Sequence, residues 1–209
     1  MKEVRTGLLV LLAFSVLLGI IYPLVVTGIG QVAFSWRANG SLLADGDRIV
    51  GSELIGQSFS SERYFRGRPS SSDYDPMNSG GSNLAPASST LLNEVEKRIA
   101  LVRSDYGLPR ESPVPADFAL ASASGLDPEI SVQSALLQVE SIAAAREIAA
   151  QVVRGLIQRH THGPFLGAFG EERVNVLRLN LALDEFMGHR AGLGSGPEAS
   201  APGAGKGEP

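Results

Sequence analysis

The chain has 209 residues, of which 44% are hydrophobic and 6% aromatic, and its formal net charge is −4. This composition is sufficient for the core of one soluble domain and excludes a wholly disordered chain, yet it is too polar for a polytopic membrane protein. The sequence contains no cysteine, which excludes a disulfide scaffold, a thiolate zinc site and a cysteine nucleophile. The net negative charge argues against a nucleic-acid-binding protein.

The hydrophobicity is concentrated near the N-terminus. No charged residue occurs between Thr6 and Trp36, and residues 7–30 form a run of 24 mostly aliphatic residues. A helix of this length is about 36 Å long, enough to cross the hydrocarbon core of a bilayer. A cleaved signal peptide is the alternative, but its apolar region is shorter and ends at a small-residue cleavage site. Residues 7–30 are therefore predicted to form a retained transmembrane helix.

The charges that flank this helix predict its orientation. Lys2 and Arg5 precede it, whereas the cations that follow it, Arg37 and Arg48, are mixed with acidic residues. Because positively charged flanks stay in the cytoplasm, the N-terminus is predicted to lie inside and the soluble part of the chain outside.

A stripe of small or polar residues follows one side of the predicted helix. Ser15, Gly19, Pro23 and Thr27 recur at intervals of four residues. Small residues allow helix backbones to approach closely, so the stripe predicts a docking face for partner helices. The ordinary use of such residues in membrane helices is the alternative. Pro23 also predicts a local kink.

Composition divides the rest of the chain into three parts. Residues 31–47 form a polar connector, residues 48–190 a soluble domain, and residues 191–209 a tail rich in glycine and proline. The tail has too few bulky apolar side chains to offset the entropy of ordering and is predicted to be disordered. The patterns within residues 48–190 predict a mixed α/β fold with few strands, carried on the single N-terminal transmembrane helix.

Local patterns predict the elements of this domain in chain order. They are a short strand at 48–50, loops over 58–89, a helix from Ser88 or Ser89 to about Asp105, a strand at 118–121, a helix start at Asp127-Pro128, a long helix over 140–159 and a strand at 174–178. Residues 179–186 either extend the last strand or turn helical.

Residues 63–69 interleave cations and aromatic side chains. Such a mixture is typical of single-stranded nucleic-acid sites, but the segment is short and the domain acidic. Tyr64, Phe65, Arg66 and Arg68 are therefore interpreted as a packing or partner-contact loop.

A second loop contains the run Ser79-Gly80-Gly81-Ser82. Successive small residues allow backbone N–H groups to converge on an anion, which makes this run a candidate nucleotide-binding loop. A tight turn that needs glycine is the commoner alternative.

The familiar catalytic motifs do not occur in the sequence: it has no phosphate-binding glycine-lysine loop, no serine elbow and no paired-histidine zinc helix. His160 and His162 lie two residues apart, and without an assignable third ligand they are interpreted as a helix end rather than a metal site. No catalytic or metal-binding residue is assigned. A membrane-tethered hydrolase that uses Asp73, Asp75, Asp127 or the three histidines remains an alternative, as does a stand-alone assembly module.

Four separated stretches occur in a recognisable order. They are GSELIGQSF at 51–59, YFRGRPSSSDYDPMNSGGSNLAP at 64–86, ASASGLDPEIS at 121–131 and ERVNVLRLNLALD at 172–184. Together with the preceding apolar helix, they resemble the small C subunit of the bacterial Kdp-type potassium-transporting P-type ATPases. The resemblance covers about residues 5–187, and the family often has glycine in place of Ala85 and proline in place of Val132.

The resemblance implies an accessory, non-catalytic subunit of an inner-membrane complex for ATP-driven potassium uptake. In such complexes a channel-like subunit selects potassium and a second subunit hydrolyses ATP through an aspartyl-phosphate, so both are implied as partners. The C subunit is commonly described as a catalytic chaperone that raises the ATP affinity of the hydrolytic subunit. Ser79–Ser82 resembles the signature loop of ABC transporters, which implies ATP as a ligand held through or with that subunit.

The predicted orientation conflicts with direct contact between this domain and ATP. With the N-terminus inside, residues 48–190 face the outside, where ATP is absent, so any effect on ATP affinity must be allosteric. The anchor is therefore expected to dock on the channel-like subunit, with the domain over its outer face as a cap or a clamp.

Overall fold

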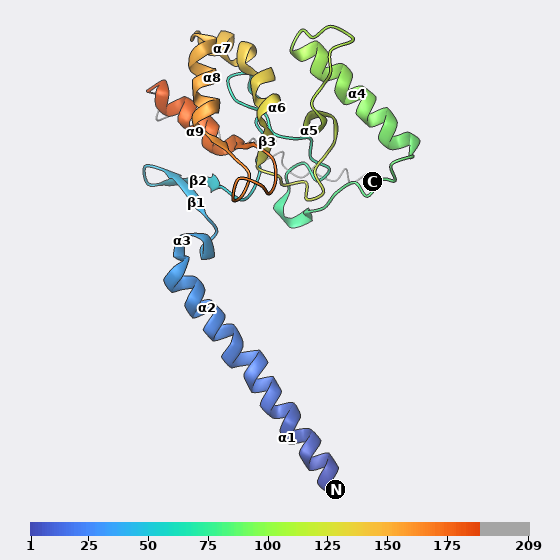
Figure 1. Ribbon diagram of the computed structural model, residues 1–209, viewed down its shortest axis with the longest axis vertical. Helices are drawn as coiled ribbons and strands as arrows, with labels where there is room; N and C mark the ends of the chain where they lie inside the picture. The colour runs from blue at the N-terminus through green and yellow to red at the C-terminus, as the bar shows by residue number, and fades with distance from the viewer. Residues whose placement is uncertain (189–209) are drawn as a thin grey trace, which may run out of the picture. The chain divides into compact units, whose positions relative to one another are not determined.

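The computed structural model describes residues 1–188, which divide into two compact units, Met1–Leu42 and the chain from Leu43 onward (Figure 1). The predicted disordered tail, residues 191–209, lies outside the described residues. The fold class is confirmed: a mixed α/β unit follows one N-terminal apolar helix.

The first unit consists of consecutive helical segments. They are α1 (Lys2–Val16), a π-helical turn η1 (Leu17–Ile21), α2 (Tyr22–Ala33) and the short α3 (Ser35–Ala38). Within the described residues, the continuous helix Lys2–Ala33 is the one helix that is long and apolar enough to cross a membrane, with a mean hydropathy of 2.7 in its most apolar stretch. All four residues of the small-residue stripe are exposed along this helix.

The wide π-helical turn lies directly before Pro23. Proline has no N–H to donate to the carbonyl of Gly19, and its ring crowds that carbonyl. The backbone accommodates the ring by widening, and the Tyr22 N–H bonds the Leu17 carbonyl oxygen instead. The structure thus has a π-helical turn next to the residue at which a local kink was predicted.

The second unit has two small sheets and a group of short helices. In chain order, its elements are β1 (Leu42–Asp45), β2 (Arg48–Ser52), the 3-10 turn η2 (Pro76–Asn78), α4 (Ser89–Asp105), α5 (Ala116–Ala119), β3 (Glu129–Ser131), α6 (Val132–Leu137), α7 (Val139–Arg146), α8 (Ala150–Arg159), β4 (Thr161–His162), β5 (Arg173–Asn175) and α9 (Val176–Phe186). Strands β1 and β2 pair with each other, and β3, β5 and β4 form an antiparallel sheet in that order. Val174 on the central strand lies opposite both Ile130 and Thr161.

The hydrophobic core lies between this sheet and helices α6–α9, which gather in one part of the unit while α4 and α5 lie apart from them (Figure 1). Its fully buried side chains include Ile130, Val139, Ile142, Val153, Ile157, Val174, Leu179 and Leu183. Phe65, from the irregular segment before α4, also enters this core and has no exposed surface.

Several predicted elements are confirmed. The strand at 48–50 lies within β2, and the helix expected from Ser88 or Ser89 to Asp105 is α4. Residues 58–89 contain only the short η2 before α4 begins. Residues 179–186 are helical, the second of the two options left open.

The long helix predicted over residues 140–159 is wrong. The chain reverses at Glu147, which has a left-handed φ of +56°, so α7 ends at Arg146 and α8 starts at Ala150. The reversal packs the apolar faces of both helices into one core. No glycine or proline marks it, because a glutamate holds the position that usually favours glycine.

Three other element predictions are wrong. The strand predicted at 118–121 is replaced by α5, since short apolar runs do not distinguish the two states. Asp127 does not begin a helix: its carboxylate accepts the Glu129 N–H in a local turn, and Ser131 caps α6 four residues later. The strand predicted at 174–178 ends at Asn175, whose side chain accepts the Arg178 N–H and caps α9.

Candidate functional site

Three of the four sequence stretches that carry the resemblance lie far apart in the chain. They contact one another through a cluster of serines and glycines. The Gly80 N–H donates to the Ser124 carbonyl at 2.8 Å, and the Ser71 hydroxyl donates to the Gly80 carbonyl at 2.7 Å. The Ser70 hydroxyl donates to the Gly125 carbonyl at 2.7 Å. Small hydroxyl side chains therefore join the loops around residues 70, 80 and 125 into one surface, which we call the motif cluster.

Glycine is required at two points of the motif cluster. The Gly56 N–H donates to the Leu126 carbonyl at 2.8 Å, and a Cβ atom at Gly56 would lie 2.5 Å from the Asp127 carbonyl oxygen. Gly125 has a φ of +68°, and a Cβ atom there would lie 2.3 Å from the Ser72 hydroxyl. Close approach of the backbone excludes a larger residue at Gly56, whereas at Gly125 the left-handed φ and the Ser72 side chain both favour glycine.

The candidate nucleotide loop is part of this cluster. The Ser79 hydroxyl donates to the Ser124 carbonyl at 3.0 Å, and a Cβ atom at Gly81 would lie 3.1 Å from the Ala123 carbonyl oxygen. The Gly80 N–H points to a carbonyl, and Ser82 is exposed. A side chain at Gly81 would therefore crowd Ala123, whereas a Cβ atom at Gly80 would meet nothing within 4 Å, and neither glycine has the positive φ that the tight-turn alternative requires. Nucleotide binding at Ser79–Ser82 stays a prediction.

Two buried amide side chains hold the aromatic and basic segment in place. Asn180 on α9 accepts the Phe65 N–H at 2.8 Å and donates to the Phe65 carbonyl at 3.0 Å. Gln138 likewise accepts the Arg66 N–H at 2.8 Å and donates to the Arg66 carbonyl at 3.2 Å. Each amide satisfies both backbone groups of one residue, as a neighbouring strand would, so an irregular segment is fixed without a sheet.

A buried ion pair holds the same segment at Tyr64, the residue before Phe65. Arg146 on α7 and Asp184 on α9 lie 2.6 Å apart with almost no exposed side-chain surface. The Tyr64 hydroxyl donates to Asp184 at 2.9 Å, and the Arg146 guanidinium carbon lies 4.6 Å from the centre of the Tyr64 ring. Burial, followed by the hydrogen bond to Asp184, raises the pKa of Tyr64. Arg146 also donates to the Arg63 carbonyl.

The structure therefore supports the packing interpretation of the aromatic and basic segment for part of its length. Phe65 is fully buried, so it contacts the core and not a partner. Arg66 and Arg68 are partly exposed, and each pairs with a carboxylate at 2.9 Å, Arg66 with Asp105 and Arg68 with Asp127. Partner contact through these two arginines stays a prediction.

A wide cleft of about 1070 Å³ lies between this segment and α4. Charges of both signs line it, together with Leu101, Tyr74 and a stacked pair, Tyr106 and Phe118, whose ring centroids lie 6.1 Å apart. The Tyr74 hydroxyl donates to the Arg68 carbonyl. Burial, and to a smaller extent the nearby Asp127 carboxylate, raises the pKa of Tyr74 to about 12. This tyrosine therefore stays neutral and positions the loop that joins the cleft to the motif cluster.

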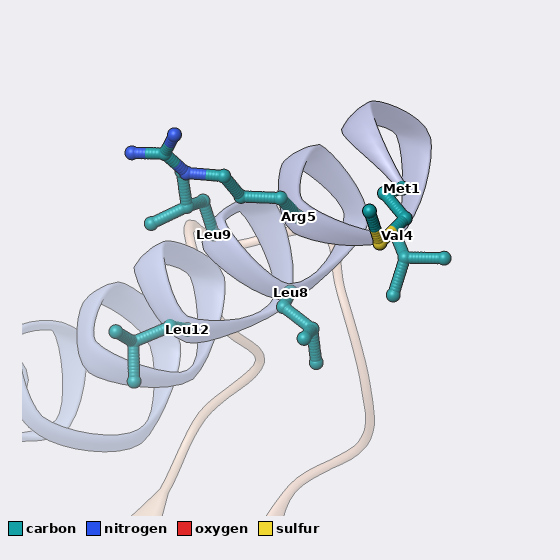
Figure 2. Close-up of a pocket in the computed structure, with 6 residues that line it drawn as sticks. All are labelled: Met1, Val4, Arg5, Leu8, Leu9 and Leu12. Carbon is teal, nitrogen blue, oxygen red and sulfur yellow. The ribbon is translucent and has the colours of Figure 1, made fainter.

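Another hollow lies in the first unit, along the start of α1 (Figure 2). It is lined by Met1, Val4, Arg5, Leu8, Leu9 and Leu12. Figure 2 shows these side chains on successive turns of a single helix. The hollow is thus part of the apolar surface of the candidate membrane helix, with Arg5 near its end, and no polar set converges there.

The described residues 1–188 contain no group of three or more histidine, aspartate or glutamate side chains that could hold a metal ion. One ring nitrogen of His160 lies 2.9 Å from the Leu156 carbonyl at the end of α8, as the helix-end interpretation expected. Asp75 caps η2 by accepting the Met77 N–H, and Asp127 pairs with Arg68.

Sequence reasoning missed the buried polar anchors Gln138, Arg146, Asn180 and Asp184. Their signal was present: Asn180 lies among leucines in an apolar helical pattern, where a polar residue needs a buried partner. The partner itself lies 115 residues earlier in the chain and could not be identified from spacing.

Comparisons with known proteins identify the family of the chain. A family model described as K+-transporting ATPase, c chain, matches residues 4–185. The "Potassium-transporting ATPase KdpC subunit" of Mycobacterium bovis (strain BCG / Pasteur 1173P2) is 47% identical over 187 residues, covering 88% of this chain and 99% of the relative. The proteins of the same name from Paraburkholderia phytofirmans and Gemmatimonas aurantiaca are 47% and 49% identical, covering 89% of this chain and 98% and 94% of their own lengths.

The family match covers both the apolar helix and almost all of the described second unit, including every stretch of the motif cluster. The resemblance noted from the four sequence stretches is thereby confirmed, and the chain belongs to the KdpC family of K+-transporting ATPase c chains.

Proposed function

We propose that this chain is the accessory subunit of an ATP-driven potassium uptake complex in the bacterial inner membrane. The helix Lys2–Ala33 anchors it and docks through the stripe Ser15, Gly19, Pro23 and Thr27 on a channel-like subunit. The folded unit lies outside, where it stabilises the assembly and promotes ATP use by the hydrolytic subunit from a distance.

The observation that carries this proposal is the convergence of the family stretches on one fixed surface beside a wide cleft. The motif cluster is joined by hydrogen bonds, and Arg66, Arg68 and Arg98 in the cleft are each paired with a carboxylate. A surface of this kind, with hydrogen-bonded loops, paired charges and a partly exposed apolar lining, is suited to contact another protein.

The cleft can be tested with a matched pair of variants on α4. Leu101 lines the cleft and is 62% exposed, whereas Leu92 lies outside its lining on the same helix and is 54% exposed. Leu101→Glu is expected to weaken co-purification of the complex or its potassium-stimulated ATPase, and Leu92→Glu to leave both unchanged. Equal behaviour of the two variants would remove the cleft from the proposal.

Deletion of residues 48–190, with the helix retained, distinguishes a clamp from a cap. Loss of the assembled complex is expected for a clamp. An intact complex without potassium-stimulated ATPase activity is expected for a cap. An intact and fully active complex would contradict both roles and favour the anchor alone.

The orientation is tested by labelling a single cysteine, which requires no background substitutions because the sequence has none. Leu92→Cys is expected to react with a membrane-impermeant maleimide in intact cells, and Lys2→Cys only after lysis. The reverse pattern would place the folded unit in the cytoplasm and make direct contact of ATP with Ser79–Ser82 the favoured mechanism.

A further inference from the structure

The connection between β4 and β5 exposes three large apolar side chains close together. Phe165, Leu166 and Phe169 are 69%, 79% and 68% exposed, and residues 163–170 carry no charge. Single exposed apolar side chains are ordinary on protein surfaces. A group of three in five residues forms a patch of the kind that marks contact with a protein or a membrane.

The backbone fixes these three side chains in a tight hairpin tip. Phe165 and Phe169 exchange two backbone hydrogen bonds, of 2.7 and 3.0 Å, and therefore lie directly opposite each other with both rings on one face. The Ala168 N–H donates to the Phe165 carbonyl at 3.2 Å and closes the turn around Leu166 and Gly167. The tip presents its apolar groups together.

Leu166 occupies a backbone conformation that suits other residues better. Its φ is +53°, in the left-handed region where the Cβ of an ordinary side chain crowds the following carbonyl. Asparagine and glycine adopt this conformation readily and are common in such turns. Leucine at this position adds strain and an exposed apolar group, and contact with an apolar medium would bury that group.

The short connector after the membrane helix indicates that the apolar medium is the bilayer. The membrane helix ends at Ala33, and the second unit begins at Leu43. Ten residues span at most about 35 Å, and a unit of this size has a radius of gyration of only about 15 Å. The surface of the second unit is thus held by covalent geometry within reach of the bilayer that its own helix crosses.

We propose that the hairpin tip Phe165–Phe169 inserts into the boundary between headgroups and acyl chains of that bilayer, as a second membrane contact of the chain. The apolar tip is followed in the chain by Glu171 and Glu172, whose charges limit the depth, and by Arg173, which pairs with Glu129 at 2.8 Å. The proposal rests on the membrane helix alone and requires neither the coupling role nor a particular side of the membrane.

The test uses the assembled complex in nanodiscs of phosphatidylethanolamine and phosphatidylglycerol. A nitroxide is attached to Leu166→Cys in the otherwise cysteine-free chain, and collisions with oxygen and with a water-soluble nickel chelate are measured. Val10→Cys within α1 provides the membrane reference, and Leu92→Cys on α4 the aqueous one. Ala168→Cys gives a second label position on the tip.

At Leu166→Cys and Ala168→Cys, we expect the ratio of oxygen to nickel collisions to exceed the Leu92→Cys value several-fold and to approach the Val10→Cys value. Free access of the nickel chelate to the tip would show that the tip lies in water and would overturn the proposal. Exclusion of both reagents would place the tip against another subunit and would overturn it equally. Because the readout does not involve ATPase activity, it can fail or succeed independently of the proposed function.

Discussion

The second unit contains two regions that are held together by different interactions. Helices α6–α9 and the three-stranded sheet enclose side chains such as Ile142, Val153 and Leu179, which are almost completely buried. The motif cluster contains almost no large apolar side chain; its loops are joined by serine hydroxyls and backbone groups. The first region is stabilised by apolar burial and the second by hydrogen bonds.

The two regions are linked by polar side chains that originate in the apolar one. Gln138, Asn180 and the pair Arg146–Asp184 project from the helices to the segment that leads into the motif cluster. A hydrogen-bonded loop region contributes little stability by itself, because each bond replaces one with water. The shape of the motif cluster therefore depends on these few anchors, and substitutions can test that dependence.

The largest effect is expected for Asp184→Ala. It leaves the Arg146 charge buried without its partner, which costs about 3–5 kcal/mol of unfolding free energy. Glu140→Ala is the matched control, since it breaks the exposed pair with Arg154 and is expected to cost less than about 1 kcal/mol. Denaturant titration of the detergent-solubilised chain measures both. Similar costs would show that the two regions are not linked through this pair.

A smaller and more local effect is expected within the motif cluster from Gly56→Ala. The added methyl group would lie 2.5 Å from the Asp127 carbonyl oxygen, so the loops must separate, at a cost of about 1–3 kcal/mol. Gly163→Ala has nothing within 4 Å of the added group and serves as the control. Hydrogen exchange is expected to increase at Leu126 and its neighbours before it increases in α7–α9. A uniform increase over the whole unit would contradict the separation into two regions.

Tyr74, in the wall of the cleft, is expected to make the unfolding free energy of the chain fall at alkaline pH. Its pKa is about 12 in the folded chain, against 10.0 for an ordinary tyrosine, because burial disfavours the phenolate. The unfolded state therefore loses this proton first. The contribution of Tyr74 to stability is complete below pH 10 and is lost as the pH rises to about 12. Tyr74→Phe is expected to lose less unfolding free energy over this interval than the parent chain, with Tyr22→Phe as the control; parallel pH profiles would contradict this.

The sequence was most informative where one local pattern determines the structure. The length of the apolar run before Trp36 and the apolar stripe of α4 are local signals, so a helix at each of those positions could be predicted. The reversal at Glu147 could not, because it is stabilised by packing of α7 and α8 on a shared core rather than by a turn residue. The helix start predicted at Asp127 was wrong for a related reason. Its carboxylate pairs with Arg68 and accepts a hydrogen bond in a local turn, and only the fold shows these contacts.

The same distinction applies to the candidate site. Its glycines and serines were visible as unusual runs, but the contact of this loop with Ala123 and Ser124 was not, because that segment lies more than 40 residues away. Spacing along the chain carries no information on that contact. Phe65 was grouped with its exposed neighbours for the same reason, although the amide of Asn180 turns it into the core.

The smallest predicted effect concerns the hairpin tip, which belongs to neither region. Leu166→Asn removes a side chain that is 79% exposed and replaces it with one that tolerates a φ of +53°. Because little buried surface is lost, we expect the unfolding free energy in detergent to rise by up to about 1 kcal/mol. Ala168→Asn, with no left-handed conformation to relieve, is expected to leave it unchanged. A loss of stability in Leu166→Asn would mean that the leucine packs on the folded unit. A higher unfolding free energy in Leu166→Asn would mean that the natural leucine destabilises the fold. A destabilising residue at an exposed tip is expected where function and not folding selects the side chain.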